Sequence, residues 1–160
     1  MSIIRKLNKL GKAVYKKYPY INCGGCCVYA ALVAEALLLH KISCKGFVSA
    51  YSAGRNANIN IDKARENIRR NVLHEWQGVG ISFNHVGLEF EHKDKLRHYD
   101  VTGVARAKKS FDFTPIYEGR LNTVELQKLA ACKAGWNDSF NRRHIPSIRK
   151  MVQEHLAIDN

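Results

Sequence analysis

Residues 22–40, "NCGGCCVYAALVAEALLLH", hold the pattern that decides the fold. From Cys26 or Cys27 to His40 the side chains are Ala, Leu or Val on nearly every side, and a helix that is apolar all round is a buried helix. Three cysteines and a pair of glycines stand at the start of this segment. Such a cluster suits a metal site, a disulfide, the packed end of a core, or a nucleophile. The stretch therefore predicts a central helix that carries thiols at its N-terminus.

The whole chain has 160 residues, which suits one domain with a substantial core, and we expect a single domain over residues 1–160. Its longest apolar run, Val28 to Leu39, is interrupted by Glu35 and is shorter than the roughly 18 residues that a membrane span needs. No secretory signal is visible, and the five cysteines are an odd number, which favours free thiols in a reducing compartment. We therefore expect a cytoplasmic protein without a disulfide framework.

The chain is strongly basic, with a formal net charge of +12 and a pI of about 9.7. The first twenty residues hold six Lys or Arg and no acidic residue. A surface of this kind attracts polyanions such as nucleic acid and anionic membranes, but a solvated basic surface explains the charge equally well. No nucleic-acid-binding motif accompanies the charge, so it indicates a class of partner and not an activity.

The predicted elements run from helices through a hairpin-rich sheet to further helices. Residues 3–17 carry apolar side chains at helical spacing with basic residues between them, which is typical of a packing helix and less often of a membrane-surface helix. The remaining predictions are strands over 42–54, 78–90 and 95–104, helices over 60–78, 121–135 and from Pro146 to about Leu156, and a loop or short edge strand over 111–119. We predict an α+β domain in which the cysteine-bearing helix packs on a small antiparallel sheet.

A thiol at the start of the buried helix is well placed for nucleophilic chemistry. The glycines before Cys26 allow a tight approach of the backbone into the helix. The positive end of the helix dipole favours a thiolate there, and the unpaired backbone N–H groups can bind an oxyanion that develops on a substrate carbonyl. Cys26 is therefore the first candidate nucleophile, and Cys23 is the alternative.

His85 is the best candidate for the base that such a nucleophile needs. If its strand returns through a loop at residues 91–94, Phe90 pairs with Lys95, and counting outward places His85 opposite Asp100. Directly opposed residues share one face of a sheet, so Asp100 would orient the imidazole and stabilise its protonated form. A register shift of one residue would put the two side chains on opposite faces.

These residues resemble a family. "CGGCC" at residues 23–27 is similar to the C-G-S/A-C-W/Y run of papain-like thiol proteases, and "HVGLEF" followed by "HYDVTG" is similar to the His and Asp strands of transglutaminase-like proteins and their NlpC/P60-like relatives. The resemblance covers roughly residues 20–104. It implies a papain-like or transglutaminase-like fold with Cys26 as nucleophile, His85 as general base and Asp100 as the residue that orients it.

The resemblance also implies a chemistry and a class of substrate. The thiolate would attack a peptide, isopeptide or side-chain amide carbonyl to form a thioester, and water or an amine would resolve it. We expect a protein or peptide substrate, an additional polyanion such as nucleic acid at the basic surface, and no cofactor or metal.

The sequence departs from the papain-like pattern at the oxyanion hole. Papain-like enzymes have a Gln six positions before the nucleophile, whereas this chain has Tyr20 there. The side-chain amide of Asn22 is the candidate replacement, and Gln77 is another. The aromatic residue that follows the nucleophile is also replaced, by Cys27.

Other interpretations stay open beside this one. Cys27, Cys44 and Cys132 read as small core residues, because free cysteine is commonly buried. Cys23 and Cys26 have the spacing of zinc ligands, and a zinc site would be completed by one of three histidines, His85, His92 or His98. In a purely structural reading His85 is a packed residue and Asp100 ends a strand. The alternative function is therefore a non-catalytic, basic, nucleic-acid-binding protein whose cysteines are structural or hold zinc.

Overall fold

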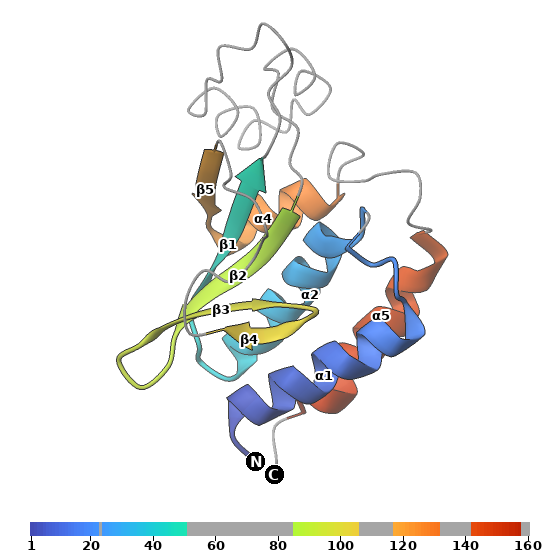
Figure 1. Cartoon of the computed structure of the whole chain (residues 1–160), viewed down its shortest axis with the longest axis horizontal. Coiled ribbons are helices and arrows are strands. Elements are labelled where there is room, and N and C mark those ends of the chain that lie inside the picture. The colour runs from blue at the N-terminus through green and yellow to red at the C-terminus, as the bar shows by residue number, and fades with distance from the viewer. Residues whose placement is uncertain (23, 51–84, 106–116, 132–141, 158–160) are drawn as a thin grey trace, which may run out of the picture.

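The computed structural model describes residues 1–22, 24–50, 85–105, 117–131 and 142–157 (Figure 1). In chain order its elements are α1 (Ile3–Lys17), α2 (Cys26–Leu39), β1 (Cys44–Ala50), β2 (His85–Glu91), β3 (Leu96–Asp100), β4 (Gly103–Ala105), β5 (Tyr117–Leu121), α4 (Thr123–Ala131), the short 3₁₀ helix η3 (Arg142–His144) and α5 (Ile145–His155). The helix predicted over 60–78 lies outside the described residues.

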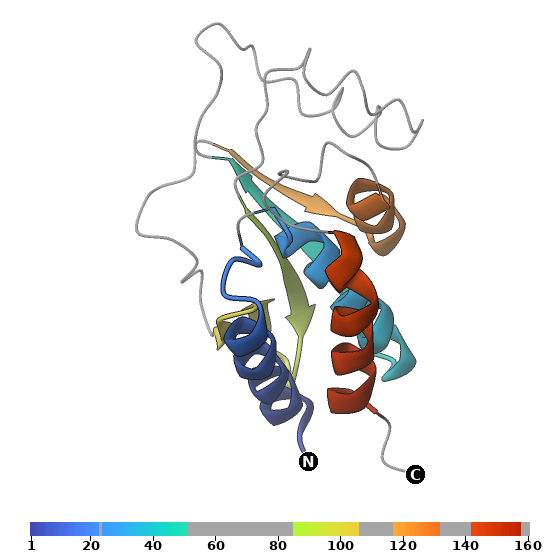
Figure 2. The same cartoon turned by 90° about the vertical axis from the view of Figure 1, so that its right-hand side faces the viewer.

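The described strands form one antiparallel sheet in the order β4-β3-β2-β1-β5. The helices α2 and α4 contact β1, and α2 also contacts β2. The helices α1 and α5 contact each other and lie side by side in both views (Figure 1, Figure 2). The α+β class predicted from the sequence is therefore confirmed. The edge strand β5 overlaps the end of the segment 111–119, predicted as a loop or short edge strand, and extends to Leu121.

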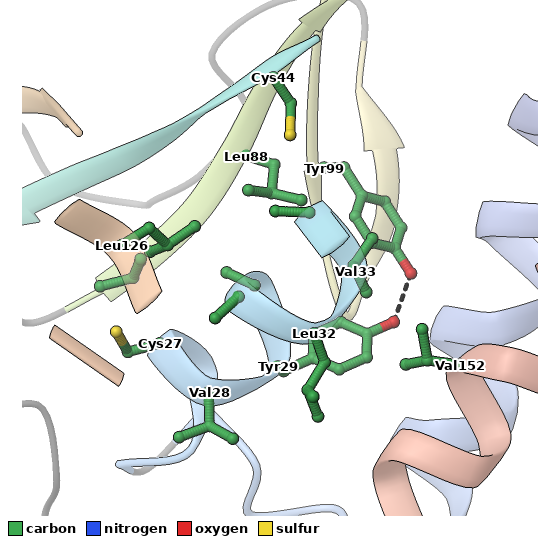
Figure 3. Packing of buried hydrophobic residues seen from close by; sticks show 14 of the residues in the cluster. Cys27, Val28, Tyr29, Leu32, Val33, Cys44, Leu88, Tyr99, Leu126 and Val152 are labelled. Carbon is green, nitrogen blue, oxygen red and sulfur yellow. Dashed lines mark hydrogen bonds between the residues drawn. The ribbon is translucent and has the colours of Figure 1, made fainter. Parts of the chain in front are cut away.

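Helix α2 is the centre of the core, as its composition predicts. Its buried residues run without a break from Cys27 to Ala34 and include Leu37. Figure 3 shows side chains from several elements gathered around this helix, among them Leu88 of β2 and Leu126 of α4. A helix that is apolar on every side needs such neighbours on every side, since each exposed apolar side chain would forfeit about 1.5–3 kcal/mol.

Helix α1 is amphipathic, and its apolar side faces the protein. Leu7, Leu10 and Val14 have no exposed surface, so the packing interpretation of residues 3–17 is confirmed and the membrane-surface interpretation is wrong for this side of the helix. No helix among the described residues combines the length and the apolar character that crossing a membrane requires.

The two C-terminal helices begin as their sequences predict. Asn122 and Glu125 form a reciprocal cap at the start of α4: the Glu125 N–H donates to the Asn122 side-chain oxygen at 2.8 Å, and the Asn122 N–H donates to the Glu125 carboxylate at 2.9 Å. Pro146 stands in the first turn of α5, where its missing N–H costs nothing. Glu35, on α2, pairs with Arg149 of α5 but is only partly buried.

The hairpin between β2 and β3 exists, but its predicted register is wrong by two residues. Phe90 pairs with Arg97, not with Lys95, because the turn consists of Lys93 and Asp94. Both turn residues have positive φ, 52° and 59°, as in the tight two-residue turn that matches the twist of a hairpin. The predicted loop at 91–94 is therefore replaced by a shorter turn one step further along the chain.

The segment 95–104, predicted as one strand, folds into two. β3 ends at Asp100, Val101 and Thr102 form a turn, and β4 starts at Gly103. Gly103 has a φ of +121°, which side chains other than glycine rarely tolerate, and a Cβ there would lie 2.8 Å from the side-chain oxygen of Asn8. This second turn places Asp100 at a strand end.

Candidate functional site

Each of the three predicted site residues lies at one end of a helix or strand. Cys26 is the first residue of α2, His85 is the first residue of β2, and Asp100 is the last residue of β3. Because β2 and β3 are antiparallel, the start of one strand and the end of the other lie at the same end of the hairpin. The arrangement therefore combines one helix N-terminus with two strand ends.

His85 and Asp100 are in contact, although they are not directly opposed. The Nε2 atom of His85 lies 3.1 Å from Oδ2 of Asp100, and the histidine is only 5% exposed. The observed register ends with Leu88 opposite Tyr99, and its continuation by one residue places Gly87 opposite Asp100, so the contact of His85 with Asp100 is diagonal. The predicted pairing was wrong by an even number of residues, which keeps both side chains on the same face of the sheet.

Gly87 makes room for this diagonal contact. A Cβ at this position would lie 2.9 Å from the carbonyl oxygen of Tyr99 and 3.8 Å from both Nε2 of His85 and Cβ of Asp100. A glycine within a strand often marks such a close approach, so Gly87 is the signal in the sequence for this contact.

The second carboxylate oxygen of Asp100 is held by Thr102. The Thr102 N–H donates to Oδ1 at 2.7 Å, and the Thr102 hydroxyl donates to the same atom at 2.5 Å. Burial by itself raises the pKa of Asp100, but the hydrogen bonds from His85 and Thr102 outweigh it and lower that pKa below its ordinary value. Asp100 is therefore an oriented carboxylate. The motif "DVT" is typical of a side-chain-capped turn and is the local signal in the sequence for this role of Thr102.

The imidazole of His85 meets the Cys26 thiol as well as the carboxylate. Burial alone lowers the pKa of His85, but hydrogen bonds to Asp100 and Cys26, with the charges of both groups, raise it to about 9. The ring is thus held as a cation at neutral pH, and its titration is coupled to that of its neighbours. A protonated imidazole beside a thiol is the environment in which a thiolate is stabilised.

A pair of buried tyrosines ties the elements of this site together. The hydroxyls of Tyr29, on the first turn of α2, and Tyr99, next to Asp100, hydrogen-bond to each other (Figure 3), and the Tyr99 hydroxyl also donates to the Leu7 carbonyl at 3.1 Å. Burial raises the pKa of both phenols far above the physiological range, so both remain neutral. Tyr29 lies in the apolar segment of α2 and Tyr99 in the polar segment "LRHYD", so only the fold shows that the two pair.

The remaining candidates for the site are placed as follows. Asn22 lies partly buried in the turn that precedes α2, and Tyr20 in the same turn is 74% exposed. Cys23 and Gln77 lie outside the described residues. The structure thus brings together Cys26, His85 and Asp100, while the oxyanion role of Asn22 stays a prediction.

Two of the other cysteines are core residues, as predicted. Cys27 is 1% exposed, and burial raises the pKa of Cys44 to about 11. Cys132 lies outside the described residues.

The histidines named for a zinc site have separate environments. His92 flanks the hairpin turn, and His98 lies 3.6 Å from Glu89 and edge-on to the ring of Phe47. Within the described parts of the chain no three such side chains gather as metal ligands.

Comparisons with protein-family models, with curated proteins and with solved structures found no match to this chain.

Proposed function

We propose that this protein is a thiol-dependent acyl-transfer enzyme in which Cys26 is the nucleophile, His85 the acid–base residue and Asp100 the residue that orients it. The observation that carries the proposal is the position of the His85 imidazole, which is in contact with the Cys26 thiol and lies 3.1 Å from the Asp100 carboxylate. Covalent acyl transfer needs a nucleophile in contact with a base, and a third group in contact with the base that orients it.

The proposed reaction starts from an ion pair of thiolate and imidazolium. The sulfur attacks an amide carbonyl, the C–N bond breaks, and the imidazolium gives its proton to the departing amine, which leaves a thioester on Cys26. The neutral imidazole then takes a proton from water, and the resulting hydroxide displaces the thiolate, which releases the acid and restores the ion pair. If an amine replaces water, the product is a new amide.

The proposal extends to the fold family and the substrate. The chain order of cysteine, histidine and aspartate, and the packing of α2 on the antiparallel sheet, support a papain-like or transglutaminase-like relationship. The proposed substrate is a peptide, isopeptide or side-chain amide of a protein. Backbone N–H groups of the first turn of α2 and the Asn22 amide are the proposed donors to the oxyanion.

The proposal is tested by alkylation of the native protein with iodoacetamide at about pH 6, where an ordinary thiol is mostly protonated and reacts slowly. Intact mass gives the rate, and peptide mapping gives the site. We expect one fast modification at Cys26, and a rate reduced by about tenfold or more in the His85→Ala variant. The matched control is His98→Ala, which removes a histidine that also pairs with a carboxylate across β2 and β3.

Three results would contradict the proposal: a modification rate at Cys26 no higher than that of a free-thiol peptide, an equal effect of the two histidine variants, or a fast reaction at Cys23 alone. Unreactive thiols with bound zinc would favour the non-catalytic alternative instead.

A further inference from the structure

The basic residues of α1 form a row along its exposed side. Arg5, Lys9, Lys12 and Lys16 are all exposed and follow one another at spacings of four, three and four residues. At 3.6 residues per turn these spacings place the four side chains on one face of the helix. We call this set of four residues the basic row.

Among the described residues, the charges of the basic row are not neutralised by ion pairs. Helix α1 contains no acidic residue, and within the described chain none of the four side chains has an ion pair. The neighbouring helix α5 shows the ordinary pattern of a solvated helix. There the guanidinium of Arg149 lies 2.8 Å from the Glu35 carboxylate, and Lys150 lies 3.8 Å from Glu154.

Further basic residues continue the row beyond the C-terminal end of α1. The ring of Tyr18 packs against His144, with centroids 5.0 Å apart, and Lys17 donates to the Ser147 hydroxyl at 2.9 Å. These contacts bring the exposed Arg142 and Arg143 of η3 to this end of the helix.

From this placement we infer that the basic row of α1 is a binding surface for the phosphate backbone of a nucleic acid. From Arg5 to Lys16 the row spans about 16 Å at 1.5 Å per residue. Duplex DNA presents one phosphate charge per roughly 1.7 Å of its axis, so a duplex laid along α1 offers a phosphate to each of the four cations. Contacts of this type depend on charge and not on base sequence.

The apolar side of α1 argues against the other polyanion, an anionic membrane. A membrane-surface helix buries its apolar residues in the lipid boundary. Leu7, Leu10 and Val14 are instead completely buried in the protein, where the backbone of Leu7 also accepts the Tyr99 hydroxyl. Docking on lipid would therefore rest on charge alone.

The test is fluorescence anisotropy of a short labelled duplex, titrated with the full-length chain at several salt concentrations. The variant Lys12→Gln/Lys16→Gln removes two cations of the basic row, and the control Arg149→Gln/Lys150→Gln removes two from α5. Both variants lower the net charge by the same amount, and matching thermal melts would show that both remain folded. We expect the first variant to bind about tenfold or more weakly and to lower the slope of log K against log salt by about 2, while the control keeps the slope of the unaltered protein.

Equal losses in the two variants would overturn the inference, because net charge and not the basic row would then explain binding. An unchanged affinity in Lys12→Gln/Lys16→Gln would overturn it as well. Vesicles of phosphatidylcholine with phosphatidylserine are the second probe, and tighter binding to these vesicles than to the duplex would assign the row to membranes. None of these measurements depends on the chemistry of Cys26.

Discussion

Two histidine–carboxylate pairs bridge the same two strands, and they differ in the third group that each pair meets. In the first pair the histidine, His85, lies on β2 and the carboxylate, Asp100, on β3. In the second pair the positions are reversed, with Glu89 on β2 and His98 on β3. Because alternate residues of a strand point to one face, His85, Gly87 and Glu89 belong to the same side of the sheet.

In the second pair, the carboxylate makes its closest contacts with a guanidinium and not with the histidine. Arg120 of β5 donates two hydrogen bonds to Glu89, at 3.0 and 2.7 Å, and also lies over the ring of Phe47. His98, by contrast, is 3.6 Å from the same carboxylate. Glu89 therefore forms a bidentate ion pair with Arg120, and we interpret the cluster of Glu89, Arg120 and His98 as structural. The first pair has a thiol where the second has a guanidinium, so a histidine beside a carboxylate is not by itself a sign of catalysis.

The largest expected difference between the two histidines is in how each makes the free energy of unfolding depend on pH. The pKa of His85 is raised to about 9 in the folded protein, against about 6.5 when unfolded, so the folded state favours its cation. This contribution is fully present below about pH 6.5 and is lost as the pH rises through about 9, and its full size is about 3 kcal/mol. Denaturant unfolding between these pH values should show the decline in the unaltered protein and in His98→Gln but not in His85→Gln. A decline that survives in His85→Gln would assign it to another group.

Removing the charge of each carboxylate tests whether only the first pair acts on the thiol. Asp100→Asn removes the charge of one of the two partners that raise the pKa of His85, so we expect alkylation of Cys26 at about pH 6 to slow by about tenfold or more. Glu89→Gln weakens the ion pair with Arg120 and should leave that rate unchanged. A comparable loss of reactivity in both variants would contradict this prediction, because it would mean that both carboxylates influence the Cys26 thiol.

A methyl group at Gly87 should disturb the first pair specifically. Its Cβ would lie 2.9 Å from a backbone oxygen, so strand β3 must shift, and we expect Gly87→Ala to lower the free energy of unfolding by about 2 kcal/mol. The control is Gly46→Ala, whose nearest contact would be a terminal methyl of the Leu126 side chain at 3.1 Å and not a backbone atom. If the two variants were equally stable and equally reactive, Gly87 would have no special part in the diagonal contact.

The smallest effect is expected from the tyrosine anchor. Tyr29→Phe leaves the Tyr99 hydroxyl bonded to the Leu7 carbonyl, whereas Tyr99→Phe leaves the Tyr29 hydroxyl buried without this partner. Tyr99→Phe should therefore be the more destabilising by about 1 kcal/mol, measured by denaturant unfolding. The reverse order would mean that Tyr29 and not Tyr99 links the helices to the sheet.

The main elements and the proximity of His85 and Asp100 could be predicted from the sequence alone, for a physical reason. The apolar character of residues 27–37 on every side requires burial, and alternation along 85–90 requires a strand. Alternation also determines which face a residue occupies, so the proximity of His85 and Asp100 could be predicted although their pairing was wrong. The exact offset depends on the turn, and Lys93-Asp94 lacks the glycine that usually announces a two-residue hairpin turn.

Features that depend on contacts between distant segments could not be predicted. The carbonyl of Tyr99 that lies against Gly87, and the hydroxyl of Tyr29 that meets Tyr99, have no local signature. The same holds for the guanidinium of Arg120, which comes from a strand beyond β1 and distinguishes the second pair from the first.

The three candidate site residues lie on α2, β2 and β3, so they come together only after all three elements have been synthesised and have folded. During synthesis α2 emerges well before the β2–β3 hairpin, because Cys26 precedes both His85 and Asp100 in the chain. In the proposed mechanism Cys26 lacks its activating imidazole until the hairpin docks. On that proposal, a thiol probe added during refolding would react rapidly with Cys26 only after the hairpin has docked, and its rate would report the completion of these long-range contacts.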